Sequence, residues 1–358
     1  MKNLLILVLV SACLTAFSRA VLLDRTLLSQ WYPNYQTESY LDLRWKSIDS
    51  IASNTFDGLI NLTNLYLSYN QLTSLVPTLF KDLINLKGLY LESNKLTSLD
   101  PTTFTSLINL TTLYLSGNQL TSFDSTTFKD LISLQELYLY YNKLTTLDPN
   151  IFKDLINLQR LDLSYNQLTA LDPIIFKDLI NVQVLYLHYN QLTTLDPTIF
   201  KDLINLKGLY LDYNYLTTVG PTIFKSLIKL QRLHLYSNQL TTLDPTIFKS
   251  LIKLQWLDLG VNQLSTLDPT IFKDLINLVF LELQSNQLTS LDPSLFKYLI
   301  NLQYLDLSNN RLVSIDRFIF VGLINLKNVY IGNNPISEIL PNYVLRLCST
   351  NPDCQIEI

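Results

Sequence analysis

The segment LQRLDLSYNQLTALDPIIF, residues 158–176, contains the pattern that predicts the fold. Its apolar residues follow the frame L-x-x-L-x-L-x-x-N-x-L around Asn166, and the chain repeats this frame at one constant interval without an insertion. The frame is marked by the asparagines Asn70, Asn94, Asn118, Asn142, Asn166, Asn190, Asn214, Asn238, Asn262, Asn286, Asn310 and Asn334. Self-similarity at a fixed period predicts a solenoid whose units each pack against their neighbours.

The positions inside each unit have separate structural tasks. The x-Leu-x-Leu-x stretch alternates with period two, which places the leucines on one face of a short strand. We expect stacked units to pair these strands in a parallel sheet and to bury the leucine rows. The asparagine offers a donor and an acceptor to backbone groups where the chain leaves the sheet. A phenylalanine recurs with the same period from Phe56 to Phe320 and should fill the outer part of the core.

The frame covers residues 41–345 and resembles the extracellular leucine-rich-repeat proteins of the 24-residue "typical" class, such as Toll-like receptor ectodomains and secreted leucine-rich-repeat proteins. This resemblance implies an α/β solenoid, a leucine-rich-repeat horseshoe with a parallel β-sheet on its concave face. With a degenerate first unit that includes Leu41 and Phe56, about 13 repeats of 24 residues are expected. The resemblance also implies that ligands bind through the concave face.

The N-terminal residues read as a targeting segment. Lys2 precedes the apolar run at residues 4–10, and Ser18-Arg19-Ala20 places small residues where a signal peptidase cleaves. We therefore expect a signal peptide at residues 1–20 and a secreted, extracellular product. Residues 21–40 are expected to form an N-terminal cap. No later segment reaches the length of a membrane span, so none is predicted.

The C-terminal tail, residues 346–358, contains Cys348 and Cys354, six positions apart. In an oxidising compartment this pair predicts a small disulfide loop, with two free thiols as the alternative. The Asn-x-Ser/Thr sequons begin at Asn61 and Asn109, which become predicted glycosylation sites in a eukaryotic host.

Charge and composition exclude several classes of function. The formal net charge is −4 at pH 7, and no run of Lys and Arg is present, so nucleic acid is not expected as a partner. Two His and three Cys leave few side chains for metal or nucleophilic chemistry. His188 and His234 are expected about 10 Å apart on the exposed face with Asp212 between them, too far apart for a simple metal site. We therefore predict no enzymatic activity, no cofactor and no metal.

Comparison of the units shows where recognition could occur. The residue before the first strand leucine takes nine types in twelve units, so this column is free of the packing constraints that hold the others. In three adjacent units it is Trp256, Phe280 and Tyr304, and the acids Asp258, Glu282 and Asp306 lie one column over. A strand spacing of about 4.8 Å predicts an aromatic strip beside a row of acids. A basic, partly apolar partner would suit this patch, unless the strip packs against the C-terminal cap or a second copy of the chain.

Tyrosines are the second feature of the predicted exposed face. They supply large contact area at low entropic cost, and binding surfaces are enriched in them. The alternative is that tyrosine is a good strand former copied by duplication. The candidate partner-binding tyrosines are Tyr138, Tyr140, Tyr141, Tyr165, Tyr186, Tyr189, Tyr210, Tyr213 and Tyr236.

Taken as a sequence, the chain predicts a secreted, non-enzymatic recognition protein that binds a protein or glycan partner through its concave sheet. The alternative is a structural or self-associating extracellular matrix protein in which the concave face meets another copy, as a homodimer would.

Overall fold

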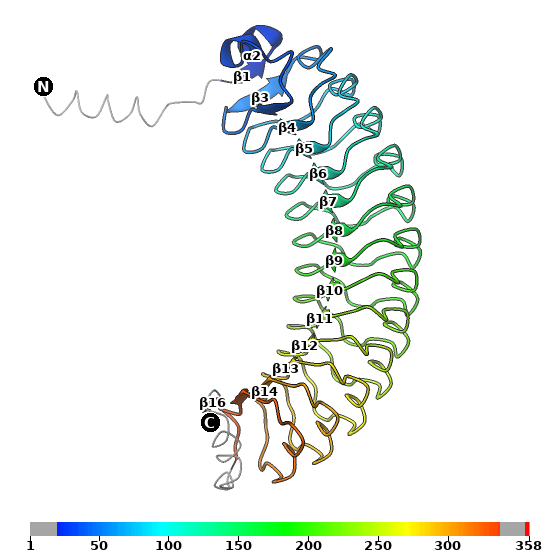
Figure 1. Ribbon diagram of the computed structural model, residues 1–358, viewed down its shortest axis with the longest axis vertical. Helices are drawn as coiled ribbons and strands as arrows, with labels where there is room; N and C mark the ends of the chain where they lie inside the picture. Colours follow the sequence, from blue (N-terminus) through cyan, green and yellow to red (C-terminus); the bar gives the residue numbers. More distant parts are fainter. Residues whose placement is uncertain (1–19, 337–354, 358) are drawn as a thin grey trace, which may run out of the picture.

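The computed structural model describes residues 20–336 and 355–357, which form a solenoid of repeated units along a curved arc (Figure 1). The predicted signal peptide lies, apart from Ala20, outside the described residues, and so do Cys348 and Cys354. The leucine-rich-repeat horseshoe predicted from the sequence is confirmed, with its parallel sheet on the concave side.

The main sheet contains fourteen strands among the described residues, and each pairs in parallel with its neighbour. Every strand from β4 to β16 has three residues, because the chain turns away as soon as the second leucine row is reached. The strands are β2 (Tyr40–Asp42), β4 (Asn64–Tyr66), β5 (Gly88–Tyr90), β6 (Thr112–Tyr114), β7 (Glu136–Tyr138), β8 (Arg160–Asp162), β9 (Val184–Tyr186), β10 (Gly208–Tyr210), β11 (Arg232–His234), β12 (Trp256–Asp258), β13 (Phe280–Glu282), β14 (Tyr304–Asp306), β15 (Asn328–Tyr330) and β16 (Gln355–Glu357). Strand β16 comes from the expected C-terminal tail and extends the sheet beyond β15.

The N-terminal end is covered by a strand and a helix. Strand β1 (Val21–Leu23) pairs with β3 (Ile48–Ile51) in a separate two-stranded sheet. Helix α2 (Arg25–Trp31) is the only α-helix in the described residues, and it begins where Asp24 accepts a hydrogen bond from the Leu27 amide. Leu23 and Leu28 are fully buried. These elements shield the first leucine rows from water, as a terminal repeat must.

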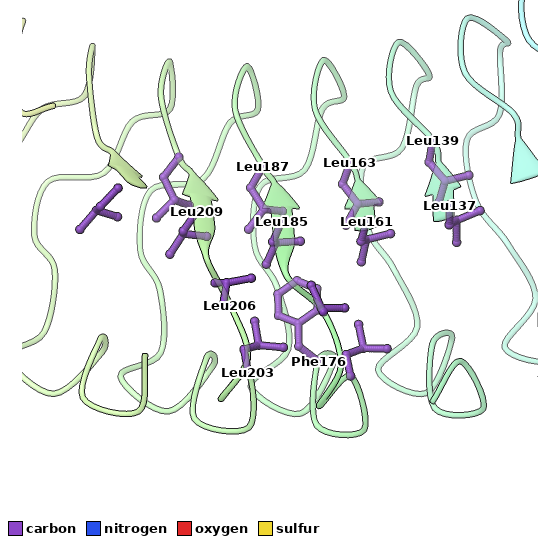
Figure 2. Close-up of a cluster of buried hydrophobic side chains, with 14 of the residues drawn as sticks. Leu137, Leu139, Leu161, Leu163, Phe176, Leu185, Leu187, Leu203, Leu206 and Leu209 are labelled. Atoms are coloured by element: carbon purple, nitrogen blue, oxygen red, sulfur yellow. The ribbon is translucent and has the colours of Figure 1, made fainter. Parts of the chain in front are cut away.

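The core consists of stacked columns of identical side chains. Figure 2 shows two rows of leucines, one within successive strands and one just after them, with Leu203 and Leu206 on the segment that leads into β10 and Phe176 nearby. All twelve phenylalanines of the column are at most 2% exposed. Since the same residue recurs in each unit, every side chain packs between its own copies, and the predicted core is confirmed.

The asparagine ladder satisfies the backbone at the turn that follows each strand. Asn166 Nδ2 donates to the carbonyls of Leu139, 3.0 Å away, and Leu163, 3.2 Å away. Its Oδ1 accepts from the Leu144 amide at 3.1 Å. The same bonds recur along the ladder, so each asparagine ties its unit to the preceding one.

Pairing in strict register makes each sequence column a straight row across the sheet. We name four rows by their members in the β12 unit. The first row contains Trp256, the second Asp258, the third Gly260 and the fourth Val261. Neighbouring members of a row are one repeat apart in the chain, and these four rows carry the candidate site.

Candidate partner-binding face

The aromatic strip of the first row is a continuous surface. Trp256 pairs in register with Phe280, and Phe280 with Tyr304. The ring centroids of Trp256 and Phe280 lie 4.6 Å apart, and those of Phe280 and Tyr304 lie 5.9 Å apart. All three side chains are partly exposed. The predicted adjacency is therefore present, although the strip's role in binding stays a prediction.

The acids beside this strip differ from the exposed row that the sequence predicts. Asp258 is only 7% exposed, because His234 and Glu282 flank it closely in the same row. The two other acids are held by local hydrogen bonds. Glu282 accepts from Trp256 Nε1 at 3.0 Å and from Gln284 at 3.2 Å. Asp306 accepts from the amide and hydroxyl of Ser308.

Burial changes the protonation of this region. Desolvation, reinforced by the charge of Glu282, raises the pKa of Asp258 to about 8. The same causes raise the pKa of Asp212 to about 7, and burial raises the pKa of Glu282. Burial also lowers the pKa of His234 to about 4, with the charge of Arg232 acting in the same direction. The second half of the face therefore contains several carboxyl groups with raised pKa values, and a nearby cation would stabilise their ionised forms.

His234 stands between two of these acids. It pairs in register with Asp258, and its Nδ1 lies 3.9 Å from Asp258 Oδ2. Donor atoms of Asp212, His234 and Asp258 all lie within 4.8 Å of one another. The sequence analysis placed Asp212 between His188 and His234 and predicted no metal site. The structure instead groups Asp212 with His234 and Asp258, and the buried Nδ1 of His188 has no hydrogen-bond partner among the described residues.

The candidate tyrosines divide among three rows. Tyr138, Tyr186 and Tyr210 belong to the second row, and Tyr140 and Tyr236 to the third. Tyr138 ends a stacked series whose centroid separations are 4.1–5.2 Å and whose members are Tyr66, Tyr90, Tyr114 and Tyr138. Asp162 interrupts the row, and the stacking resumes at Tyr186 and continues through Tyr210 to His234.

The fourth row contains a tyrosine ladder, formed by Tyr141, Tyr165, Tyr189 and Tyr213. Their ring centroids are 4.0–4.3 Å apart in face-to-face stacks. All four residues have left-handed backbone, with φ between 51 and 53°. This conformation costs a non-glycine residue about 1–2 kcal/mol, which stacking offsets in part. A cavity of about 440 Å³ runs along the ladder. Sequence reasoning found these tyrosines but could not find their backbone strain.

A polar groove is formed by the residues that immediately precede strands β4–β8. Its cavity of about 750 Å³ is lined by Asn61, Thr63, Asn85, Lys87, Asn109, Thr111, Ser133, Gln135 and Asn157. Both predicted glycosylation sites are therefore exposed in one groove. Asn109 Nδ2 donates to the Ile84 carbonyl at 2.9 Å. Sequence analysis missed this groove, because its residues precede the strand motif and carry no catalytic side chain.

A row of exposed isoleucines was also missed. Each isoleucine lies four residues before a strand and is 46–84% exposed, although its column never varies. The row consists of Ile60, Ile84, Ile108, Ile132, Ile156, Ile180, Ile204, Ile228, Ile252, Ile276, Ile300 and Ile324. The sequence did contain a signal for this row, namely an invariant apolar column outside the L-x-x-L-x-L-x-x-N-x-L frame. Because it lies outside the frame that forms the core, such a column need not be buried.

Solved structures with the same architecture share about a quarter of the sequence. A Leptospira interrogans leucine-rich-repeat protein is 26% identical, with a TM-score of 0.65 over 94% of this chain and 100% of its own. Drosophila Toll, from the Toll–Spatzle complex, is 25% identical, with a TM-score of 0.69 over 89% of this chain and 50% of its own. TLR13, in complex with ssRNA13, is 27% identical, with a TM-score of 0.64 over 89% of this chain and 54% of its own.

The chain thus spans about half the length of the Toll and TLR13 chains that it matches. The search of curated proteins found no match. No helix among the described residues is long and apolar enough to cross a bilayer.

The leucine-rich-repeat family model matches ten overlapping segments, at residues 39–96, 60–120, 84–144, 108–168, 132–192, 156–216, 180–240, 204–264, 228–288 and 276–336. Together these matches cover residues 39–336. With its asparagine ladder and its parallel sheet, the chain belongs to the leucine-rich-repeat family.

Proposed function

We propose that this protein is a secreted, non-enzymatic recognition protein whose concave sheet binds a basic, partly apolar segment of a partner protein. The observation that carries the proposal is the aromatic strip Trp256, Phe280 and Tyr304 beside acids that no Lys or Arg neutralises. Among the described residues, the ion pairs are Arg44–Asp42, Lys81–Asp57 and His234–Asp258. A partner's cation would therefore find uncompensated carboxyl groups next to apolar rings.

The relatives support recognition as the general role. Toll is bound to Spatzle and TLR13 to ssRNA13 in their solved complexes, so the fold accommodates both protein and nucleic-acid ligands. For this chain, the net charge of −4 at pH 7 favours a cationic protein segment over a phosphate backbone, which a negatively charged protein would repel. A glycan would instead be expected in the polar groove, whose amide side chains suit sugar hydroxyls.

Selection from a displayed peptide library tests the proposal without a known partner. We expect the protein to enrich peptides that combine Lys or Arg with aromatic or aliphatic residues. The Trp256→Ala/Phe280→Ala/Tyr304→Ala variant should bind the recovered peptides at least about tenfold more weakly. The matched control is Tyr66→Ala/Tyr90→Ala/Tyr114→Ala, which removes three stacked rings from the other half of the face. Equal losses in both variants, or peptides without basic residues, would contradict the proposal.

Secretion is tested by expression of the complete chain in a secretory host. If residues 1–20 are a signal peptide, we expect a mature protein in the medium whose N-terminal residue is Val21. N-terminal sequencing and intact mass give the answer directly. Retention in the cell with Met1 present would remove secretion from the proposed function.

Self-association is the second candidate, and the exposed isoleucine row favours it. The twelve exposed isoleucines form one continuous apolar row along the solenoid, and such contiguous exposed apolar surface is typical of interaction sites, whereas isolated apolar residues are not. Sedimentation of the chain and of an Ile132→Lys/Ile156→Lys/Ile180→Lys variant distinguishes the cases. A dimer or larger assembly that the variant reduces to a monomer supports self-association through this row. A monomer in both samples at high concentration contradicts it.

A further inference from the structure

We propose that Asp212, His234 and Asp258 form a binding site for a divalent transition-metal ion, with Zn²⁺ as the best match. The three residues come from the adjacent units of β10, β11 and β12. Their donor atoms lie within 4.8 Å of one another. This site shares Asp258 with the acids beside the aromatic strip, but its test requires no partner protein.

The backbone orients the two carboxylates. The Gly260 amide donates to Asp258 Oδ1 at 2.9 Å, and the Tyr236 amide donates to Asp212 Oδ1 at 3.2 Å. Such contacts hold metal ligands in place in known sites. Asp258 Oδ2 accepts no hydrogen bond from the described residues and faces His234 Nδ1 at 3.9 Å, beyond hydrogen-bond distance. A residue only 7% exposed thus directs an unpaired oxygen into the group.

Other acids of the four rows lie outside this group of three, and their side chains accept hydrogen bonds from other partners. Glu282 accepts from Trp256 and Gln284, and Asp306 accepts twice from Ser308. Asp162 is held in the same way by Ser164. The four rows therefore contain several acids, but Asp212 and Asp258 are the two whose carboxylate oxygens lie close enough to His234 to share one ion with it.

The donor set indicates the type of ion. One imidazole nitrogen and two carboxylate oxygens suit Zn²⁺ and similar transition ions, whereas Ca²⁺ and Mg²⁺ prefer oxygen ligands alone. Bond lengths of 2.0–2.2 Å place tetrahedral donors about 3.4 Å apart, so donor atoms that now lie up to 4.8 Å apart would have to approach by at most about 1.4 Å. Three protein ligands would leave a fourth coordination position for water or a partner's donor atom.

Calorimetric titration of the untagged, chelator-treated protein with Zn²⁺, and separately with Ca²⁺, tests the site. We expect one Zn²⁺ per chain and no comparable Ca²⁺ binding. Asp258→Asn and His234→Phe should each weaken Zn²⁺ binding by at least about 100-fold. The phenylalanine preserves the stacking of His234 on Tyr210, whose ring centroid is 4.8 Å away, so the sheet should fold normally. Circular dichroism checks that it does.

Two matched controls separate this site from other donors. Asp306→Asn removes an acid from the same row, and His188→Phe removes the other histidine, so both should leave Zn²⁺ affinity within about threefold of the native protein. Co²⁺ substitution should add the strong visible absorption of a low-coordinate nitrogen–oxygen site, without the near-ultraviolet band of thiolate ligation. Absence of Zn²⁺ binding, unchanged affinity in the two ligand variants, or a thiolate band would overturn the proposal.

Discussion

The two halves of the concave sheet have the same backbone but different chemistry. In the first half, strands β4–β7 carry the stacked series that ends at Tyr138, and no histidine is present. In the second half, the units of β9–β14 carry both histidines, the buried Asp258 and the aromatic strip. Core leucines, phenylalanines and ladder asparagines are the same in both.

This difference shows how the architecture separates stability from recognition. Each core side chain packs against copies of itself, so a change there disturbs two neighbours at once. A side chain in the four rows meets solvent on one side, so its type can vary from unit to unit at little cost. The halves should therefore respond alike to core substitutions and differently to substitutions in the rows.

The largest effect is expected from equivalent core deletions. Phe80→Ala in the first half and Phe272→Ala in the second should each lower the free energy of unfolding by about 3–5 kcal/mol. Both rings are at most 1% exposed and lie in the same column, 6.3–6.5 Å from a stacked neighbour. Urea denaturation measures the loss. A difference above about 2 kcal/mol between the variants would show that the two cores are not equivalent.

The asparagine ladder should give the next largest effect. Asn118→Ala and Asn262→Ala each remove two donations to leucine carbonyls and leave one leucine amide without an acceptor. We expect each to lower the free energy of unfolding by about 2–3 kcal/mol. Hydrogen exchange should locate the lost protection in the substituted unit and the one before it. Loss spread evenly over all units would contradict this local role.

His188 should make its own pH-dependent contribution to the stability of the second half. Burial lowers the pKa of His188 to about 4, below the unfolded value of about 6.5. Between these values the unfolded chain binds a proton at this side chain that the folded chain excludes, so the contribution of His188 to stability is full above pH 6.5 and falls toward pH 4. Because the side chain is partly exposed, the loss should be about 1–2 kcal/mol. His188→Gln should remove this part of the pH dependence in parallel urea titrations. An unchanged slope would show that His188 protonates freely.

The smallest effect is expected from a substitution in the fourth row, where the tyrosines have strained, left-handed backbone. Tyr189→Asn removes ring stacking from the fourth row. It also introduces a residue type that tolerates left-handed backbone, as Asn309 and Asn333 do at the equivalent positions of their own units. The free energy of unfolding should change by less than about 1 kcal/mol. Tyr114→Asn, in the unstrained second row, should cost about 1–2 kcal/mol because no strain is relieved. Thermal unfolding of both variants makes the comparison, and equal losses would show that the strain is negligible.

Much of the architecture could be predicted from the chain. The frame around Asn166 predicts the parallel strands, the buried leucines and the ladder, because each repeated residue has one chemical task. The strip of Trp256, Phe280 and Tyr304 could be predicted as well, since register follows from a strict repeat period. The burial of Asp258 could not, because it depends on the bulk of neighbours in two other strands.

The sequence by itself determined the repeat, its period and the side chains of every row, because a fixed interval leaves one way to stack the units. Only the tertiary structure decided which side chains from different rows come into contact with one another. Asp212 belongs to the third row, and His234 and Asp258 belong to the second. Their donor atoms gather within 4.8 Å because side chains lean across neighbouring strands, and that lean depends on the packing of each ring and carboxyl group beside them.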